Sequence, residues 1–110
     1  MPIKEELFTM EALAIFKTEH AARYLTQLCR HFAHKVDVSY DGDHGECRFI
    51  CGTAILDAKD GELRIRVQSH DDAQLRETQT VVERHLVQFA FREAFQSLRW
   101  QQRDDASAQL

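Results

Sequence analysis

The chain has 110 residues, 44% of them hydrophobic and 29% charged, and a formal net charge of −4. This length suits one domain with a single core, while the composition excludes wholesale disorder and the acidic total disfavours binding to nucleic acid. Apolar runs are far shorter than the roughly 20 residues of a membrane span and the N-terminus lacks a signal-peptide core, so we expect a cytoplasmic protein without membrane contact.

The sequence predicts an N-terminal extension at residues 1–11, a single α+β domain at residues 12–103 and a polar C-terminal tail at residues 104–110. The domain opens on a short apolar run, residues 12–17, which indicates a buried strand. Thr18 is a suitable N-cap for a helix that continues to Lys35. The apolar face of this helix contains Ala21, Leu25, Leu28, Cys29 and Phe32.

The opposite side of this helix is positively charged. Arg23, Gln27, Arg30 and His34 follow one another along it, flanked by His20, His31 and Lys35. Arg23 and Arg30 lie about 10 Å apart on one face, which suits a small anionic ligand with a carboxylate or phosphate group. The histidines would strengthen such binding as the pH falls through their ordinary range near 6.5. The alternative is that this positive side is neutralised within the fold by Asp37, Asp41, Asp43 or Asp57.

The middle of the chain predicts a meander of strands. Residues 36–40 alternate between apolar and polar, and a turn at residues 41–45 follows. Residues 47–56 continue as a strand in which Gly52 marks a bulge or bend, and residues 63–68 alternate without error after a second hairpin turn. Arg48, Arg64 and Arg66 would line the open sheet face, which we expect to be solvated and crossed by ion pairs, since no aromatic platform for a nucleic acid lies beside them.

The second helix begins at a capping box formed by Ser69 and Asp72 and ends near Arg92. Its apolar stripe contains Leu75, Thr78, Val82, Leu86 and Phe89. Val87 and Phe91 point away from this stripe, which predicts a homodimer that associates through them. A closing strand follows at residues 97–101.

Together these elements predict a two-layer α+β sandwich, in which a mostly antiparallel sheet carries two helices on one face, in the order β-α-β-β-β-α-β. The predicted core consists of Ile15, Leu25, Leu28, Phe32, Val38, Phe49, Ile55, Leu63, Ile65, Val67, Val82, Leu86, Phe89 and Trp100.

The sequence indicates no metal and no cofactor. His31 and His34 are spaced to share a metal ion, but zinc needs three or four ligands, and solvated surface histidines are the simpler interpretation. Cys47 and Cys51 would lie roughly 13 Å apart on a strand, too far to chelate one ion. The odd number of cysteines indicates reduced thiols. Phosphate loops, dinucleotide fingerprints and nucleophile elbows are absent from the sequence.

Two segments resemble a bacterial family catalogued as domain of unknown function 2218. They are TEHAARYLTQLCRHFAHK at residues 18–35 and VERHLVQFAFRE at residues 82–93, and the resemblance extends over residues 12–101. Similar domains are associated with flavin-dependent siderophore-reducing proteins, so the resemblance implies a link to iron and siderophore handling. It implies no activity, since the family has none established.

We therefore expect a non-enzymatic accessory or ligand-binding module, with Arg23, Arg30, His31, His34 and Lys35 as its candidate anion site. The alternative is a small enzyme that uses histidine acid–base chemistry. Further candidate residues are His20, His85, Arg92 and Glu93, although a histidine at the edge of a helix more often satisfies a backbone group. A cleft that joins the histidines of the first helix to Arg92 and Glu93, with a strongly shifted pKa, would favour the enzyme.

Overall fold

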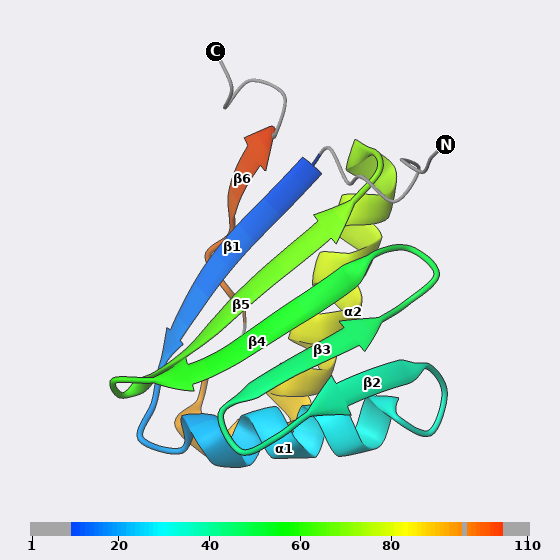
Figure 1. Ribbon diagram of the computed structural model, residues 1–110. Coiled ribbons are helices and arrows are strands. Elements are labelled where there is room, and N and C mark those ends of the chain that lie inside the picture. Colours follow the sequence, from blue (N-terminus) through cyan, green and yellow to red (C-terminus); the bar gives the residue numbers. More distant parts are fainter. Residues whose placement is uncertain (1–9, 96, 105–110) are drawn as a thin grey trace.

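The computed structural model describes residues 10–95 and 97–104 (Figure 1). It confirms the two-layer α+β architecture: six antiparallel strands form one open sheet in the order β2-β3-β4-β5-β1-β6, and both helices cover the same face. The elements are β1 (Met10–Lys17), α1 (Ala21–Phe32), β2 (Asp37–Tyr40), β3 (His44–Arg48), β4 (Thr53–Lys59), β5 (Glu62–Ser69), α2 (Asp72–Phe89), the 3-10 helix η2 (Phe91–Glu93) and β6 (Gln101–Asp104).

The sheet has one strand more than predicted, because the predicted strand at residues 47–56 is interrupted by a tight turn. Phe49 N donates to Gly52 O at 2.8 Å and Gly52 N donates back to Phe49 O at 3.3 Å. The chain therefore reverses direction at Gly52, and β3 pairs antiparallel with β4. Gly52 is buried against Ser69 of β5 and Thr78 of α2.

The core lies between the sheet and the two helices. Leu63, Ile65 and Val67 on β5 are fully buried, as their alternation predicts. The predicted face of α1 is also buried, and so are Val82 and Leu86 of α2. Val38, Phe49, Phe89 and Trp100, which were also predicted for the core, are partly buried and pack against its margin.

Two core predictions were wrong, both on strands without an alternating pattern. Ile15 is 47% exposed, and Ile55 is only partly buried. β1 instead turns Ala12 and Ala14 inward, and β4 turns Ala54 inward. A strand that is apolar on both faces carries no alternating pattern, so the sequence does not indicate which face is buried. The small alanine side chains on the inner face allow the helices to pack close to the sheet.

Both predicted N-caps were wrong by two residues. His20, not Thr18, occupies the N-cap position of α1, and Thr18 Oγ1 accepts a hydrogen bond from His20 N at 3.0 Å. Asp71 caps α2 by accepting from Gln74 N at 2.8 Å. Ser69 is instead the buried last residue of β5 and donates to Cys51 O at 2.8 Å.

The C-terminal part also differs from the prediction. α2 ends at Phe89, η2 follows, and Ala94 then adopts a left-handed conformation with φ 57° and ψ 34°. The last strand is formed by residues 101–104 rather than 97–101, and it pairs with the start of β1 at Met10 and Glu11. Most of the predicted extension and tail, residues 1–9 and 105–110, lies outside the described residues.

Candidate functional site

A cavity of about 630 Å³ opens where the end of β1, the start of α1, the β4–β5 turn and η2 meet. The end of β1, the start of α1 and the β4–β5 turn lie at the lower left of Figure 1. Thr18 N donates to Gly61 O at 3.0 Å, which fastens the β1–α1 connection to that turn. We call this hollow the α1–η2 cavity; it is lined by Lys17, Thr18, Glu19, His20, Arg23, Tyr24, Gly61, Arg92 and Glu93. Its volume is in the usual range of small-molecule sites.

Glu93 is held in the cavity by hydrogen bonds from two neighbouring side chains. Thr18 Oγ1 donates to Glu93 Oε2 at 2.7 Å, and Tyr24 Oη donates to the same oxygen at 2.9 Å. Burial, and secondly the hydrogen bond to Glu93, raises the pKa of Tyr24 above its ordinary value of 10. The phenol therefore stays protonated at neutral pH and acts as a hydrogen-bond donor.

The rest of the lining holds more positive than negative side chains. Lys17, Arg23 and Arg92 line the cavity against one further carboxylate, that of Glu19. The first backbone hydrogen bond of α1 runs from Tyr24 N to His20 O. The preceding N–H groups have no intrahelical acceptor, so the positive end of the helix dipole points toward this corner. The arrangement favours a negatively charged ligand.

A smaller hollow of about 400 Å³ adjoins the first one. It shares Arg23, Tyr24 and Arg92 with the α1–η2 cavity and is otherwise lined by Gln27, Phe89 and Phe91. Arg23 and Arg92 thus line both hollows. Arg92 also lies over the Phe91 ring, with its guanidinium carbon 5.4 Å from the ring centroid.

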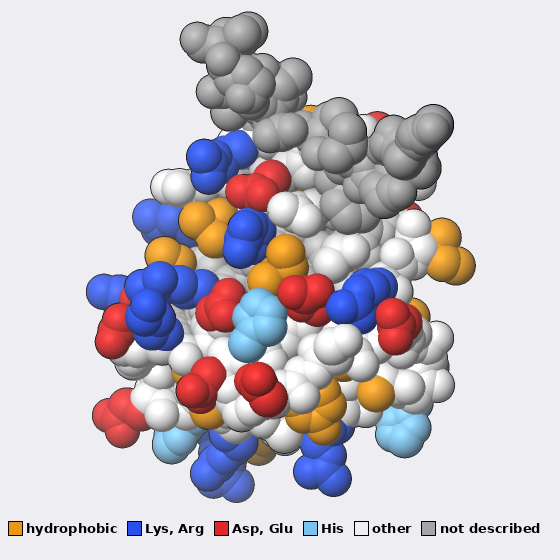
Figure 2. Space-filling model, viewed as in Figure 1, with side chains coloured by type: hydrophobic (Ala, Val, Ile, Leu, Met, Phe, Trp, Pro, Cys, Tyr) orange, Lys and Arg blue, Asp and Glu red, His pale blue; other side chains and the backbone are white. Residues whose placement is uncertain are grey.

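The structure separates the candidate residues of the first helix into two groups. Arg23 and His20 are exposed side chains that line the α1–η2 cavity, whereas the equally exposed Arg30, His34 and Lys35 lie outside it, toward and beyond the end of α1. Basic side chains are visible in Figure 2 along the lower edge, where α1 lies in Figure 1.

The aspartates that might have neutralised α1 are mostly engaged elsewhere. Asp37 pairs with Arg48, Asp57 pairs with His44, and Asp41 Oδ1 accepts from two backbone N–H groups of the β2–β3 turn. Neither Arg23 nor Arg30 forms an ion pair with a residue that the structure describes.

His31 packs against α2 rather than against His34. Its ring centroid lies 4.7 Å from that of His85 and 5.7 Å from that of Phe89. Burial, and secondly the charge of His85, lowers the pKa of His31 below 6.5. His85 Nδ1 donates to Val81 O at 2.7 Å, the backbone role expected for it. Among the described residues, no group of three or more His, Cys, Asp or Glu side chains is arranged to hold a metal ion.

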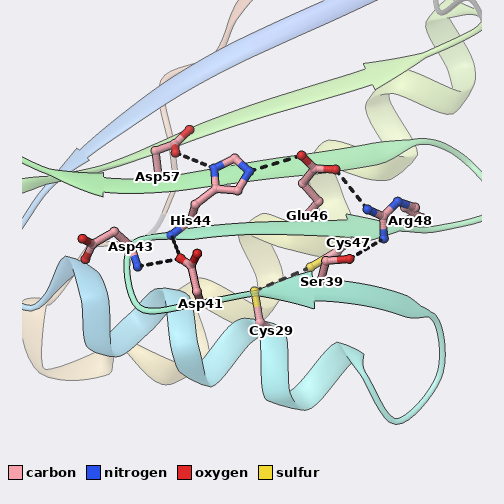
Figure 3. Close-up of polar contacts among 9 residues, drawn as sticks. All are labelled: Cys29, Ser39, Asp41, Asp43, His44, Glu46, Cys47, Arg48 and Asp57. Carbon is pink, nitrogen blue, oxygen red and sulfur yellow. Dashed lines mark hydrogen bonds and ion pairs between the residues drawn. The ribbon is translucent and has the colours of Figure 1, made fainter.

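The open sheet face carries ion pairs, as the sequence predicts. A chain of contacts runs from Asp57 through His44 and Glu46 to Arg48 (Figure 3). Figure 2 shows acidic and basic side chains mixed over this face. Both ring nitrogens of His44 face carboxylates, with Nδ1 2.7 Å from Asp57 Oδ1 and Nε2 3.2 Å from Glu46 Oε2. Both nitrogens can donate at once only when the imidazole is protonated.

This geometry predicts a pH-dependent contribution to stability from His44. The hydrogen bonds to Asp57 and then Glu46 raise its pKa above 6.5. The stabilisation is therefore fully present below pH 6.5 and is lost as the pH rises through the folded-state pKa. His44→Gln should lower the free energy of unfolding more at pH 5.5 than at pH 8.5 in denaturant titrations. In an Asp57→Asn background this difference should shrink, and an equal effect of His44→Gln at both pH values would contradict the assignment.

The cysteines lie in the core and beside it. Cys29 Sγ of α1 and Cys47 Sγ of β3 are 4.0 Å apart, and both residues are buried free thiols (Figure 3). Cys51 is also free and accepts a hydrogen bond from Thr78 Oγ1 at 3.2 Å. These contacts agree with the predicted packing role of the thiols.

A third hollow lies on the outer side of α2. Val87 lines it together with Trp100, whose Nε1 donates to Glu83 Oε1 at 2.8 Å. Phe91 is 67% exposed. The two residues of the predicted dimer contact therefore lie at different degrees of burial.

The fold and the site define a small two-layer α+β domain with a cationic cavity at one corner. The model of a family described as an uncharacterized protein conserved in bacteria (DUF2218) matches residues 13–101, and the chain belongs to this family. The NMR structure of PA4090 from Pseudomonas aeruginosa is similar, with a TM-score of 0.69 and 29% sequence identity, covering 88% of this chain and 96% of that chain. No curated protein matches. None of the helices that the structure describes is long and apolar enough to cross a membrane.

Sequence reasoning missed Lys17, Thr18 and Tyr24 as site residues. The sequence predicts Lys17 at the end of a strand and Thr18 at a helix cap. Tyr24 follows Arg23 on α1, at the boundary between its apolar and polar sides. The signal that could have identified Tyr24 is its hydroxyl, since a mostly buried tyrosine usually finds a hydrogen-bond partner.

Proposed function

We propose that this domain is a ligand-binding module that takes a small anionic molecule into the α1–η2 cavity. One observation supports this proposal above all: Arg23 and Arg92 line the same cavity at the start of α1. The two arginines come from distant segments of the chain. Guanidinium groups bind carboxylate or phosphate oxygens through paired hydrogen bonds, and backbone N–H groups at a helix start favour the same ligands.

The remaining candidate residues have a supporting role in this proposal. Arg30 and Lys35 extend the positive surface along and beyond α1, with the imidazoles of His31 and His34 beside them. Exposed charges of one sign raise the rate at which an oppositely charged ligand arrives, and this effect falls with ionic strength. We therefore propose that they attract the ligand, while Arg23 and Arg92 hold it.

Charge reversal at the two arginines tests the proposal. The parent protein and an Arg23→Glu/Arg92→Glu variant are titrated with L-malate, a small dicarboxylate, at pH 6 and pH 8 by heteronuclear NMR. We expect about 100-fold weaker binding in the variant, because two charge-assisted contacts become repulsive. The matched control is Arg30→Glu, which reverses a charge on α1 outside the cavity and should weaken binding only severalfold.

Two outcomes would overturn the proposal. The first is that the parent protein binds malate at neither pH. The second is that the double variant binds malate as the parent does. A ferric siderophore, titrated in parallel, tests the link to iron handling that the family resemblance implies.

An enzyme that uses acid–base chemistry is the second candidate, because the cavity joins His20 to Arg92 and Glu93. Tyr24 does not support an enzyme. A general acid or base works best when its pKa is close to the working pH, and the raised pKa of Tyr24 is far above neutral pH. Prolonged incubation with malate separates the two candidates. The binding module leaves the ligand spectrum unchanged, whereas conversion that is lost in His20→Gln would identify an enzyme.

Self-association through Val87 and Phe91 and a cytoplasmic location stay predictions. The exposure of Phe91 supports the first, and analytical ultracentrifugation at high protein concentration measures it.

A further inference from the structure

Glu93 is an unusual component of a site for anions. Its Oε2 accepts hydrogen bonds from Thr18 and Tyr24, whereas its Oε1 has no partner among the described residues. An ionised carboxylate can accept about four hydrogen bonds, so Oε1 retains its full capacity. A ligand that presents only anionic oxygens to this cavity would meet repulsion from Glu93, as well as attraction from Arg23 and Arg92.

Building on the proposed function, we infer that the ligand is a dicarboxylate with a hydroxyl or ammonium group on the carbon beside one carboxylate. Arg23 and Arg92 come from separate elements and can each take one carboxylate. The neighbouring donor then bonds to Glu93 Oε1, which converts the repulsion into a charge-assisted hydrogen bond. Thr18 and Tyr24 fix the orientation of Glu93, so they act as positioning residues.

The site should discriminate against a dicarboxylate that lacks the hydroxyl or ammonium group. Glu93 then loses solvent on ligand entry without gaining a partner, next to a second negative charge. A site built to hydrogen-bond a ligand group rejects the analogue that lacks it much more strongly than an apolar pocket rejects a missing methylene. We expect the analogue without the donor to bind about tenfold more weakly or worse.

Three ligands with the same four-carbon skeleton test this inference. Succinate has only hydrogen at the second carbon, L-malate has a hydroxyl group there, and L-aspartate has an ammonium group. Each is titrated into the parent protein at pH 7 and constant ionic strength by heteronuclear NMR. We expect malate, aspartate or both to bind at least about tenfold more tightly than succinate. The better of the two identifies the donor as a hydroxyl or an ammonium group.

A pair of variants assigns the selectivity to Glu93. In Glu93→Gln the amide oxygen can still accept from Thr18 and Tyr24, while its NH₂ group replaces the acceptor that faces the ligand. We expect the preference over succinate to fall below about threefold. Glu19→Gln removes the same charge from the lining of the same cavity without touching these hydrogen bonds, and it should keep the parent's preference.

The outcomes separate this inference from the proposed function. Equal affinity for all three ligands, with binding still about 100-fold weaker in Arg23→Glu/Arg92→Glu, overturns the selectivity and leaves the anion site in place. Selectivity that persists in Glu93→Gln overturns the assignment to Glu93. If none of the three ligands binds the parent protein, both proposals fail. If Glu93→Gln does not fold, the comparison of the three ligands on the parent protein still shows whether the site selects a ligand with a donor group.

Discussion

Replacement of Gly52 by alanine is expected to lower the free energy of unfolding by about 3–5 kcal/mol. An added Cβ would lie 2.3 Å from Ser69 Oγ, 2.4 Å from Gln68 O and 2.7 Å from Thr78 Oγ1. The Gln68 oxygen belongs to the backbone of β5, so it cannot move without disturbing the sheet. Ser69 and Thr78 are buried with their hydroxyl oxygens 3.2 Å apart, and their displacement would disturb that contact as well.

Urea titration followed by circular dichroism measures this loss, and Gly42→Ala is the matched control. Gly42 lies in the β2–β3 turn, where an added Cβ meets nothing within 4 Å. The control should therefore change stability by less than about 1 kcal/mol. Similar stability of the two variants would show that the turn at Gly52 is not packed against β5 and α2 as described.

The second large effect is expected at Leu28, which is fully buried between α1 and the sheet. Leu28→Ala removes most of the side chain and leaves a cavity that the surrounding side chains fill only in part. Substitutions of this kind cost about 2–5 kcal/mol, a large share of the total stability of a small domain. Thermal and urea denaturation should both report the loss.

Gln27→Ala tests whether the effect at Leu28 comes from burial rather than from a change in helix propensity. Gln27 precedes Leu28 on α1 and is exposed. Alanine is a good helix former, so this variant should be as stable as the parent to within about 0.5 kcal/mol. Equal losses at the two positions would mean that α1 does not bury the Leu28 face.

On α1 and β5 the hydrophobic pattern has a clear period, and there the sequence predicted the buried faces correctly. The 3.6-residue period of α1 and the strict alternation on β5 each identified the buried side chains. The errors at Ile15 and Ile55 fall in apolar runs, where either face could have been the inner one. In these two strands tertiary packing determines which face is buried, and alanines point toward the helices.

The candidate site was predicted in pieces. The positive side of α1 points to Arg23, whereas a cleft that joins the histidines of the first helix to Arg92 and Glu93 is raised only as the feature that would favour an enzyme. Their meeting depends on how η2 packs against the start of α1, and no local pattern encodes that contact. For the same reason the sequence could not separate Arg23, which lines the cavity, from Arg30, which does not.

Ala94 has a consequence for the energetics of ligand capture. Alanine in a left-handed conformation is disfavoured by roughly 1 kcal/mol or more, and here it directly follows Glu93 at the end of η2. The folded domain tolerates this cost because the hydrogen bonds from Thr18 and Tyr24 hold Glu93 in one place. The carboxylate is thus preorganised: its conformational entropy is lost when the chain folds, so an arriving ligand does not have to order it.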